Sequence, residues 1–280
     1  MHQGYNYQPE SKAWATKFLT GQSDSLVLAP RPQNSFGSRF VIGEFSFHNR
    51  SGSPAVIGIG GRLPIALWSF GTWTEANYAA GVVYTDDSVD AKDADAGDVN
   101  LDTVSTANDG FVIGCEVPFN IASLMISQAS ASGTVWDVFY SVASSNTGFS
   151  NNFKSLTNLY VAPSFGAGNT GEQLIWFEPP LDWHKVTPST AIVNRHGNTV
   201  PSQYLLVVKS STAPDTTRGQ LTLAVLGRMF QSTEGVADNN ILNNIGGQEI
   251  ALPPQCDAIC AACSVANVQN RVDVKWRYAG

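Results

Sequence analysis

Residues Phe40–His48 read FVIGEFSFH, an apolar run that is rich in phenylalanine and β-branched residues. Nine further runs of this kind follow along the chain, separated by clusters of Gly, Ser, Asn, Asp and Pro. They cover Ala55–Ile59, Ile65–Phe70, Gly110–Val117, Ile121–Ser127, Thr134–Val142, Leu156–Ala162, Glu172–Phe177, Gln203–Lys209 and Gln220–Phe230. Valine, isoleucine and aromatic residues favour strands, whereas Gly, Asn, Asp and Pro favour turns. The pattern therefore predicts an all-β fold.

Helical periodicity is weak, and the segments predicted as short helices are Glu10–Leu19 and Val236–Ile245. The strands begin about a dozen residues or more apart, with long loops between them, which is typical of a β-sandwich or a jelly roll. We therefore expect a jelly-roll-like β-sandwich with little helix.

The chain divides by composition into three zones: an N-terminal arm (1–38), a β-sandwich body (39–230) and a C-terminal extension (231–280). The extension is rich in Gly, Asn and Pro, and Val272–Tyr278 (VDVKWRY) alternates apolar and polar residues near its end. This alternation is typical of an edge strand, and an exposed edge strand requires a pairing partner. The partner is expected to be the body of the same chain or a neighbouring chain.

The composition points toward contacts with other proteins. Of the 280 residues, 43% are hydrophobic and 14% are charged, whereas an average soluble domain carries roughly 25% charged residues. The net charge of -7 argues against direct nucleic-acid binding, which requires clustered cations. The arm is only mildly basic, and we interpret it as a protein-binding arm.

No signal for export or membrane insertion is visible in the sequence. The chain does not start with a cationic region followed by an apolar run, and no stretch approaches the ~18 apolar residues of a membrane span. Four cysteines are too few for a disulfide framework in a chain of this length. The sequence therefore predicts synthesis in a reducing cytoplasm and no membrane partner.

Three of the cysteines, Cys256, Cys260 and Cys263, have the C-x3-C-x2-C spacing with which radical S-adenosylmethionine enzymes hold an iron–sulfur cluster. Those enzymes are β/α barrels, and this sequence lacks alternating helices and strands. A zinc site would need a fourth ligand, and Cys115 is far away in sequence. We expect buried or interfacial thiols, with metal binding as the alternative.

A glycine-rich stretch, Gly58–Pro64, follows an apolar run and begins like a dinucleotide-binding fingerprint. The third glycine position is Leu63, and Pro64 leads into another extended run instead of a helix. The stretch is therefore predicted to be a turn.

An acidic stretch between Asp86 and Asp98 concentrates carboxylates around a single cation, Lys92. Oxygen ligands at alternate positions can bind Ca²⁺, and the candidate ligands are Asp86, Asp87, Asp90, Asp93 and Asp95. The glycine and the closing glutamate of an EF-hand are missing. A solvated acidic loop is favoured, calcium is the alternative, and no cofactor is expected.

Signals for catalysis are weak. The sequence has no Gly-x-Ser-x-Gly or His-Glu-x-x-His motif, and Asp182 and His184 lie close together without an evident nucleophile. A glycosidase pair would have to come from carboxylates such as Glu75, Glu116, Glu172 and Glu178. We therefore expect that the chain is not an enzyme.

Tryptophans are frequent and lie in or beside the predicted strands, at Trp68, Trp73, Trp136, Trp176, Trp183 and Trp276. Large rings contribute much buried area to a core or a subunit interface, and they can also stack on sugars. A core or interface role is favoured, because one face of an alternating run must be buried.

The segment Trp73–Phe230 resembles modules of tailed-phage structural proteins. The resemblance is carried by Asn108–Gly114, Val117–Asn120, Trp136–Tyr140, Glu172–Phe177 and the turn Pro179–Trp183 (PPLDW). Tyr204–Lys209 and Gln220–Phe230 also look like the last hairpin of a viral jelly roll. The cysteine-bearing extension departs from the phage pattern.

The resemblance implies a capsid-associated structural protein of a bacteriophage: a cement, decoration or minor capsid subunit of the virion, made in the host cytoplasm. Its expected partners are the major capsid protein or other virion proteins, and copies of itself in a homo-oligomer, with a trimer favoured. The predicted interface residues are Trp14, Phe18, Leu19, Val272, Val274, Trp276 and Tyr278. The alternative is a tail-fibre module that binds a receptor or carbohydrate, and a glycan-degrading enzyme is less favoured.

Overall fold

The computed structural model describes residues 13–18, 23–26, 39–50, 52–74, 85–93, 99–102, 107–131, 133–143, 152–166, 168–186, 202–212, 217–234, 241–243, 249–265 and 270–279. For residues 13–18, 23–26, 73, 230–234, 241–243 and 279 it describes the backbone alone.

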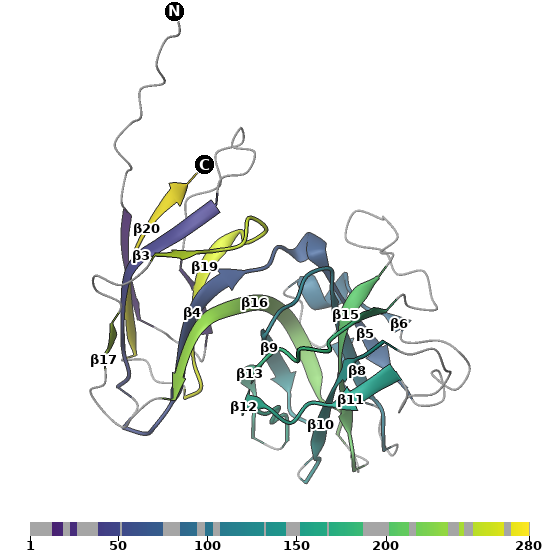
Figure 1. Cartoon of the computed structure of the whole chain (residues 1–280). Coiled ribbons are helices and arrows are strands. Elements are labelled where there is room, and N and C mark those ends of the chain that lie inside the picture. Colours follow the sequence, from purple (N-terminus) through teal and green to yellow (C-terminus); the bar gives the residue numbers. More distant parts are fainter. Residues whose placement is uncertain are drawn as a thin grey trace, which may run out of the picture. The chain divides into compact units, whose positions relative to one another are not determined.

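Antiparallel strands make up most of the described residues (Figure 1). In chain order they are β1 (Ala13–Phe18), β2 (Ser23–Leu26), β3 (Arg39–His48), β4 (Val56–Arg62), β5 (Trp68–Trp73), β6 (Thr85–Asp86), β7 (Val99–Asn100), β8 (Gly110–Cys115), β9 (Ile121–Gln128), β10 (Trp136–Ser141), β11 (Phe153–Ser155), β12 (Leu159–Val161), β13 (Gly171–Phe177), β14 (Lys185–Val186), β15 (Gln203–Ser210), β16 (Gln220–Glu234), β17 (Ile241–Asn243), β18 (Ile250–Ala251), β19 (Ala258–Cys263) and β20 (Arg271–Ala279). Two 3-10 turns, η1 (Ile65–Leu67) and η2 (Asp90–Lys92), are also present. None of the described helical segments has the length and apolar character needed to cross a membrane. The predicted all-β sandwich class is confirmed, and the jelly-roll arrangement stays a prediction.

The chain folds into two compact units. Unit 1 combines residues 1–62 with residues 229–280, and unit 2 is the continuous segment Leu63–Arg228. The described strands of the predicted arm and extension thus share a unit with β3 and β4. The three predicted zones do not match this division, because composition along the chain cannot show that distant segments pair.

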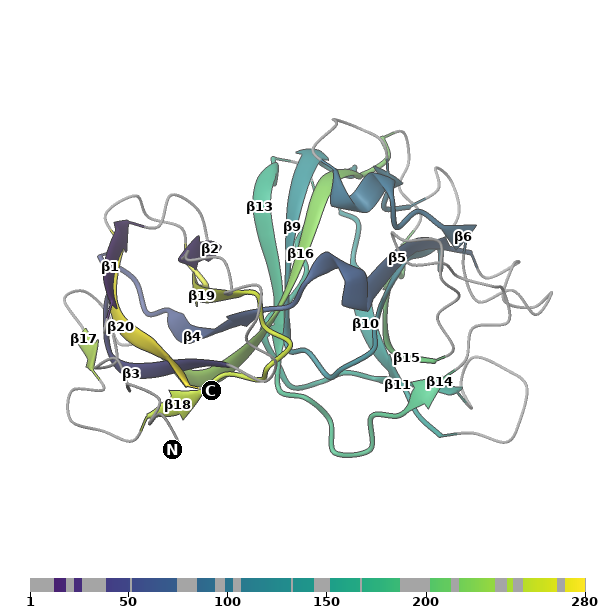
Figure 2. The ribbon, with the colours of Figure 1, turned by 90° about the horizontal axis from the view of Figure 1, so that it is seen from above.

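Unit 1 is built from two layers of strands (Figure 2). One layer, called sheet A, has the order β1-β20-β3-β17, and β18 also pairs with β3. The other layer contains β2, β19 and β4 in that order, followed by the last part of β16. Strands from both ends of the sequence therefore complete each layer.

The strand β20 is internal to sheet A, which corrects the predicted edge strand. It pairs with β1 on one side and with β3 on the other. Val272 and Val274 lie opposite Phe47 and Phe45 of β3, and all four side chains are buried. The alternation in β20 thus reflects one apolar face that packs inside unit 1.

Both predicted helices are wrong where the structure describes them. Residues Ala13–Phe18 form β1, which pairs with β20, and Ile241–Asn243 form β17, which pairs with β3. Tertiary pairing supplies hydrogen-bond partners that a local sequence pattern does not show.

The glycine-rich stretch predicted as a turn is instead part of β4. Gly58 and Gly60 lie opposite Ala262 and Cys260 of β19. A Cβ added at Gly61 would lie 2.4 Å from the Cys256 sulfur. Glycine thus allows the cysteine-bearing segment to approach β4 closely.

Unit 2 contains a sheet with the order β11-β10-β15-β8-β5-β6, with β14 beside β15. A second group of strands, β12-β13-β9-β16, carries β7 beside β16. The segments that resemble a final jelly-roll hairpin, β15 and β16, lie in different sheets, so the hairpin prediction is wrong. Figure 1 shows both groups of strands.

Aromatic side chains fill much of the core of unit 2. Phe70 stacks on Phe111 with 5.2 Å between ring centroids, and Trp136 meets Phe165 edge to face at 5.2 Å. Large rings of this kind bury extensive apolar area. The predicted core role of Trp136 is therefore confirmed within this unit.

Unit 2 begins and ends on neighbouring backbone segments. The Leu63 amide donates to the Leu226 carbonyl at 2.9 Å. An inserted domain whose ends lie side by side can interrupt its host with little constraint on either part.

Candidate functional site

The described part of the acidic stretch is hydrogen-bonded to β5. The Thr72 amide donates to Asp87 Oδ2 at 2.8 Å, and Asp86 accepts hydrogen bonds from the amide and the hydroxyl of Ser88. Partial burial raises the pKa of the Asp87 carboxyl. Two of the predicted calcium ligands are thus used in local hydrogen bonds.

Asp90 begins the η2 turn, Asp93 is exposed, and Asp95 lies outside the described residues. Across the described ranges, no group of three or more His, Cys, Asp or Glu residues could hold a metal ion. The calcium hypothesis therefore gains no support from these residues.

Strand geometry directs the side chains of Cys260 and Cys263 to opposite faces of the sheet. Cys260 and Cys263 are three residues apart in β19, and successive side chains of a strand point to opposite faces. Cys256 precedes the strand and packs against Gly61. Burial raises the pKa of Cys260 and of Cys263, so both thiols are held in their protonated form.

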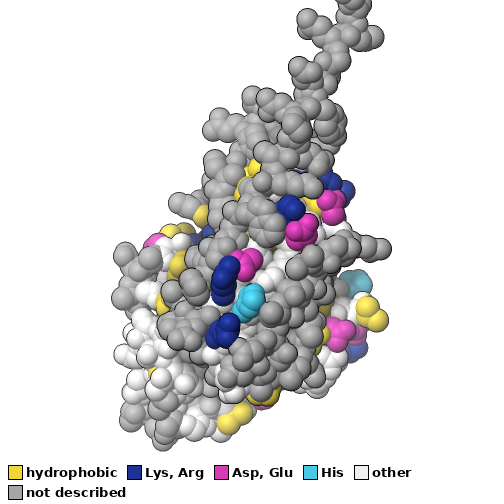
Figure 3. Space-filling model, turned by 90° about the vertical axis from the view of Figure 1, so that its left-hand side faces the viewer, with side chains coloured by type: hydrophobic (Ala, Val, Ile, Leu, Met, Phe, Trp, Pro, Cys, Tyr) yellow, Lys and Arg dark blue, Asp and Glu magenta, His cyan; other side chains and the backbone are white. Residues whose placement is uncertain are grey.

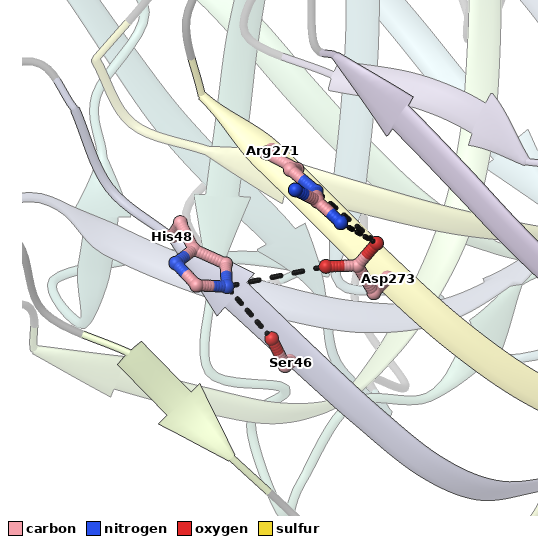
Figure 4. A network of polar contacts seen from close by, with 4 residues as sticks. All are labelled: Ser46, His48, Arg271 and Asp273. Carbon is pink, nitrogen blue, oxygen red and sulfur yellow. Dashed lines mark hydrogen bonds and ion pairs between the residues drawn. The ribbon is translucent and has the colours of Figure 1, made fainter.

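A polar network joins β3 and β20 on the outer face of sheet A (Figure 4). Ser46 Oγ lies 3.0 Å from His48 Nε2, and Asp273 Oδ2 lies 3.9 Å from the same nitrogen. Arg271 donates to Asp273 Oδ1 through Nη2 at 2.9 Å. Sequence analysis did not select these residues, because their proximity depends on the strand register.

The network differs from a Ser-His-Asp catalytic triad. In a triad the serine and the aspartate contact different ring nitrogens, so that the aspartate orients the base. Here Ser46 and Asp273 both approach Nε2 of His48. The arrangement fits a cross-strand polar cluster better than an activated nucleophile.

Further ion pairs lie on the same face. Lys275 Nζ is 3.0 Å from Glu44 Oε1, and Arg277 Nη2 is 2.7 Å from Glu249 Oε2. Figure 3 shows acidic, basic and histidine side chains close together on this side of the molecule. Exposed pairs of this kind contribute about 0–1 kcal/mol each, so they favour solubility more than stability.

Among the predicted glycosidase carboxylates, Glu172 and Glu178 are too far apart to act as a pair. Glu172 is the second residue of β13, and Glu178 directly follows that strand. About 20 Å of extended chain therefore separates them, whereas a catalytic pair needs ~5–9.5 Å. Ser123 Oγ donates to Glu172 Oε1 at 2.5 Å. Glu116 follows β8, and Glu75 lies outside the described residues.

The predicted corner Pro179–Trp183 is strongly anchored in unit 2. The Trp183 ring is buried, and its Nε1 donates to the Leu205 carbonyl at 3.1 Å. The same ring packs against Phe119 and Phe177, with centroids 5.2 and 5.6 Å away. These contacts fix the C-terminal side of the corner.

The other anchor is Asp182. Its Oδ1 accepts from the Tyr140 hydroxyl at 2.9 Å, and its Oδ2 lies 2.5 Å from Lys154 Nζ. The hydrogen bond from Lys154 lowers the pKa of Asp182, so this carboxylate stays charged at neutral pH. Burial raises the pKa of Tyr140, and its hydroxyl therefore remains a donor.

Between these anchors, Leu181 is fully exposed at 107% relative accessibility. The Trp183 amide closes the turn on the Pro180 carbonyl at 3.3 Å. His184 is exposed, and its backbone is held by Ser141, whose hydroxyl donates to the His184 carbonyl at 2.6 Å. The corner thus presents the Leu181 side chain to solvent on a backbone that hydrogen bonds hold in place.

The predicted interface residues divide into three groups. Val272, Val274 and Trp276 are buried inside unit 1, and their assignment to an interface between chains stays a prediction. Tyr278 is partly buried and contacts Phe40 and Trp276. These side chains complete the core of their own chain.

The remaining predicted interface residues belong to the arm. Trp14 and Phe18 occupy register positions opposite Lys275 and Arg271, and Leu19 lies outside the described residues. The predicted trimer, its contacts with other virion proteins and the absence of nucleic acid remain predictions.

The described tryptophan side chains are buried, namely Trp68, Trp136, Trp176, Trp183 and Trp276. A ring that binds sugar by stacking must expose a face to the ligand. The carbohydrate-binding alternative therefore gains no support from these five residues.

No protein-family model, curated protein or solved structure matches this chain. The assignment of the corner as a candidate binding site therefore depends on its geometry alone.

Proposed function

We propose that this chain is a structural subunit of a bacteriophage particle, in the class of cement, decoration or minor capsid proteins. It works by binding other protein subunits. The observation that carries the proposal is the anchored corner, which presents Leu181 to solvent between Pro180 and Asp182.

The fixed backbone of the corner preorganises Leu181 for contact with a partner. Burying a leucine side chain in a partner contributes about 1.5–3 kcal/mol. A loop that must first become ordered loses part of this gain, whereas a backbone already fixed by Trp183 and Asp182 does not. A single exposed leucine is common on protein surfaces, so its fixed presentation is the distinguishing feature.

The low charge of the chain supports the same proposal. Only 14% of residues are charged, with 43% hydrophobic, as expected of a subunit whose surface is partly covered by protein. A receptor-binding tail-fibre module and a glycan-degrading enzyme are weaker candidates, because the described tryptophans are buried and Glu172 and Glu178 lie too far apart along one strand.

The proposal is tested on bacteriophage particles purified from cultures in which this chain is produced. Quantitative mass spectrometry across a density gradient should find it at a fixed ratio to the major shell protein. A chain that stays with the unassembled lysate proteins would contradict the proposal.

The contact itself is tested with Leu181→Asp. Because the side chain makes no buried contact within the chain, the variant should fold normally, and its retention on particles should fall about tenfold or more. Val89→Asp is the matched control, since Val89 is also an exposed apolar residue of unit 2. Equal retention of both variants would exclude the corner as the contact.

A further inference from the structure

We propose that neighbouring copies of this chain exchange their arm strands. The edge of β20 accepts β1 of a second copy, and the edge of β19 accepts β2 of that copy. This inference goes beyond the proposed function because it names a surface and its partner. It is tested on the purified protein and does not depend on a particle.

One segment of chain supplies an outer strand to each layer of unit 1 (Figure 2). Among the described strands, β1 pairs with β20 alone and β2 pairs with β19 alone. The register runs from Ala13 opposite Trp276 to Phe18 opposite Arg271, and from Ser23 opposite Ala262 to Leu26 opposite Ile259. The arm strands are thus additions to the edges of two sheets.

Both acceptor strands are held by other partners when the arm strands are left out. β20 pairs with β3 over its whole length, and β19 pairs with β4 over its whole length. The side chains of Val274 and Ala261 are buried in these strands. An empty edge would therefore persist as a ready template for another strand.

The connector between β2 and β3 is twelve residues long, from 27 to 38. Residues 27–38 can span at most about 40 Å when fully extended, and they lie outside the described residues. Pro30 and Pro32 within this segment have no backbone N–H and cannot extend a hydrogen-bonded ladder.

An edge strand binds through main-chain hydrogen bonds, and every copy of the chain has the same acceptor edges. An exchanged arm therefore forms the same pairs as an arm docked on its own chain. The balance depends on whether the local concentration of copies exceeds the effective concentration at which the chain presents its own arm to these edges. Copies held side by side in an assembly favour exchange.

The register supplies a direct test, because Ser25 lies opposite the native Cys260. Directly opposed residues have Cβ atoms about 4.5–5.5 Å apart, near the spacing of a disulfide. One chain carries Ser25→Cys together with Cys260→Ala and an affinity tag, and the other is the unaltered, untagged chain. Only an exchanged arm brings the new thiol to Cys260 of the other copy.

The two chains are refolded together at increasing concentration with a mild oxidant present throughout, so that Cys260 can react before folding buries it, and they are then separated on a non-reducing gel. We expect disulfide-linked pairs of tagged and untagged chains, in an amount that rises with concentration. The matched control places the thiol two residues earlier, as Ser23→Cys with Cys260→Ala, opposite Ala262. The control should give at most a tenth of this product.

A chain with Ser25→Cys alone reports whether the arm docks in this register. If it forms a disulfide within one chain while the mixed chains form none, exchange is refuted. If it forms no disulfide at all, the pairing of β2 with β19 is refuted and the proposal fails with it. Circular dichroism of each variant confirms that the strands are folded.

Discussion

Asp102 joins two segments of unit 2 although its side chain has almost no access to water. Its Oδ2 accepts from the Ser130 hydroxyl at 2.8 Å, and its Oδ1 accepts from the Gly219 amide at 3.2 Å. Burial raises the pKa of this carboxyl despite both hydrogen bonds. The folded chain therefore holds the proton more tightly than the unfolded chain does.

The pH dependence of stability follows from this shift. The stabilising contribution of Asp102 is fully present at acid pH and is lost as pH rises through the folded-state pKa. In Asp102→Asn the amide can still bond Ser130 and Gly219 and does not ionise. The variant should be at least as stable as the parent at neutral pH, with a smaller advantage as pH falls toward about 4.

Urea unfolding at several pH values measures this difference. Asp93→Asn is the control, because Asp93 is exposed. A loss of stability in Asp102→Asn that is the same at every pH would show that the hydrogen-bond geometry, rather than the buried charge, governs this site.

The four cysteines are free and buried, which predicts their reactivity. Burial raises the pKa of Cys115 to about 12 and also raises the pKa of Cys260 and Cys263. Only the thiolate reacts readily with a disulfide reagent. In the folded protein we therefore expect no reaction with a chromogenic aromatic disulfide at mildly alkaline pH, and reaction of all four thiols after unfolding in guanidinium.

The absorbance change on mixing measures this directly. Rapid labelling of one thiol before denaturant is added would contradict the expectation and identify a cysteine with access to solvent.

At the scale of the strand, Gly110 permits β8 to lie against β15. A Cβ at this position would lie 2.0 Å from the Val208 carbonyl oxygen, a backbone atom that cannot move aside without disturbing the sheet. Gly110→Ala should therefore lower the free energy of unfolding by about 1–3 kcal/mol or more. Chemical denaturation with a fluorescence readout measures the change.

Gly43→Ala is the matched control, because a Cβ there meets no atom closer than 3.9 Å. It lies in β3 beside a register irregularity of the β3–β20 pair. Its effect should stay below about 1 kcal/mol. Equal losses in both variants would contradict the steric explanation for Gly110.

Several strands could be predicted because their own residues determine them. Runs of β-branched and aromatic residues mark three of these strands, Arg39–His48, Gly171–Phe177 and Gln203–Ser210. The observed bounds of these strands agree with the predicted runs within about one residue. The corner Pro179–Trp183 could also be predicted from its own residues, because proline and aspartate favour turns.

Other strands could not be predicted from local pattern. β19 reads AICAAC, a set of mostly small residues with weak strand preference, and its pairing with β4 depends on a segment about 200 residues earlier in the chain. The network of Ser46, His48 and Asp273 depends on the register between β3 and β20. The bond between Tyr140 and Asp182 joins residues 42 positions apart.

For the molecule as a whole, the insertion of unit 2 into unit 1 was not predictable from composition, because both units contain similar strands. The insertion leads to a prediction. Leu63–Arg228 expressed alone should fold into a β-rich monomer, since its core is internal and its ends meet through the Leu63–Leu226 hydrogen bond. Cooperative thermal unfolding followed by circular dichroism measures this.

The complementary piece provides the contrast. Residues 1–62 expressed without 229–280 should remain unfolded, because β3 would lack β20 and β4 would lack β19. An unfolded Leu63–Arg228 fragment would show instead that the two units depend on each other.

The division of unit 1 between two distant stretches of sequence also has a consequence during synthesis on the ribosome. β3 and β4 emerge early, but β17, β18, β19 and β20 are translated after the whole of unit 2. Until then, β3 lacks β20, whose Val274 and Val272 lie opposite Phe45 and Phe47. Unit 2 can fold as soon as Arg228 has emerged, whereas the nascent β3 keeps an unpaired edge until β20 has been translated. Fast translation of the last segment would shorten this exposure to aggregation.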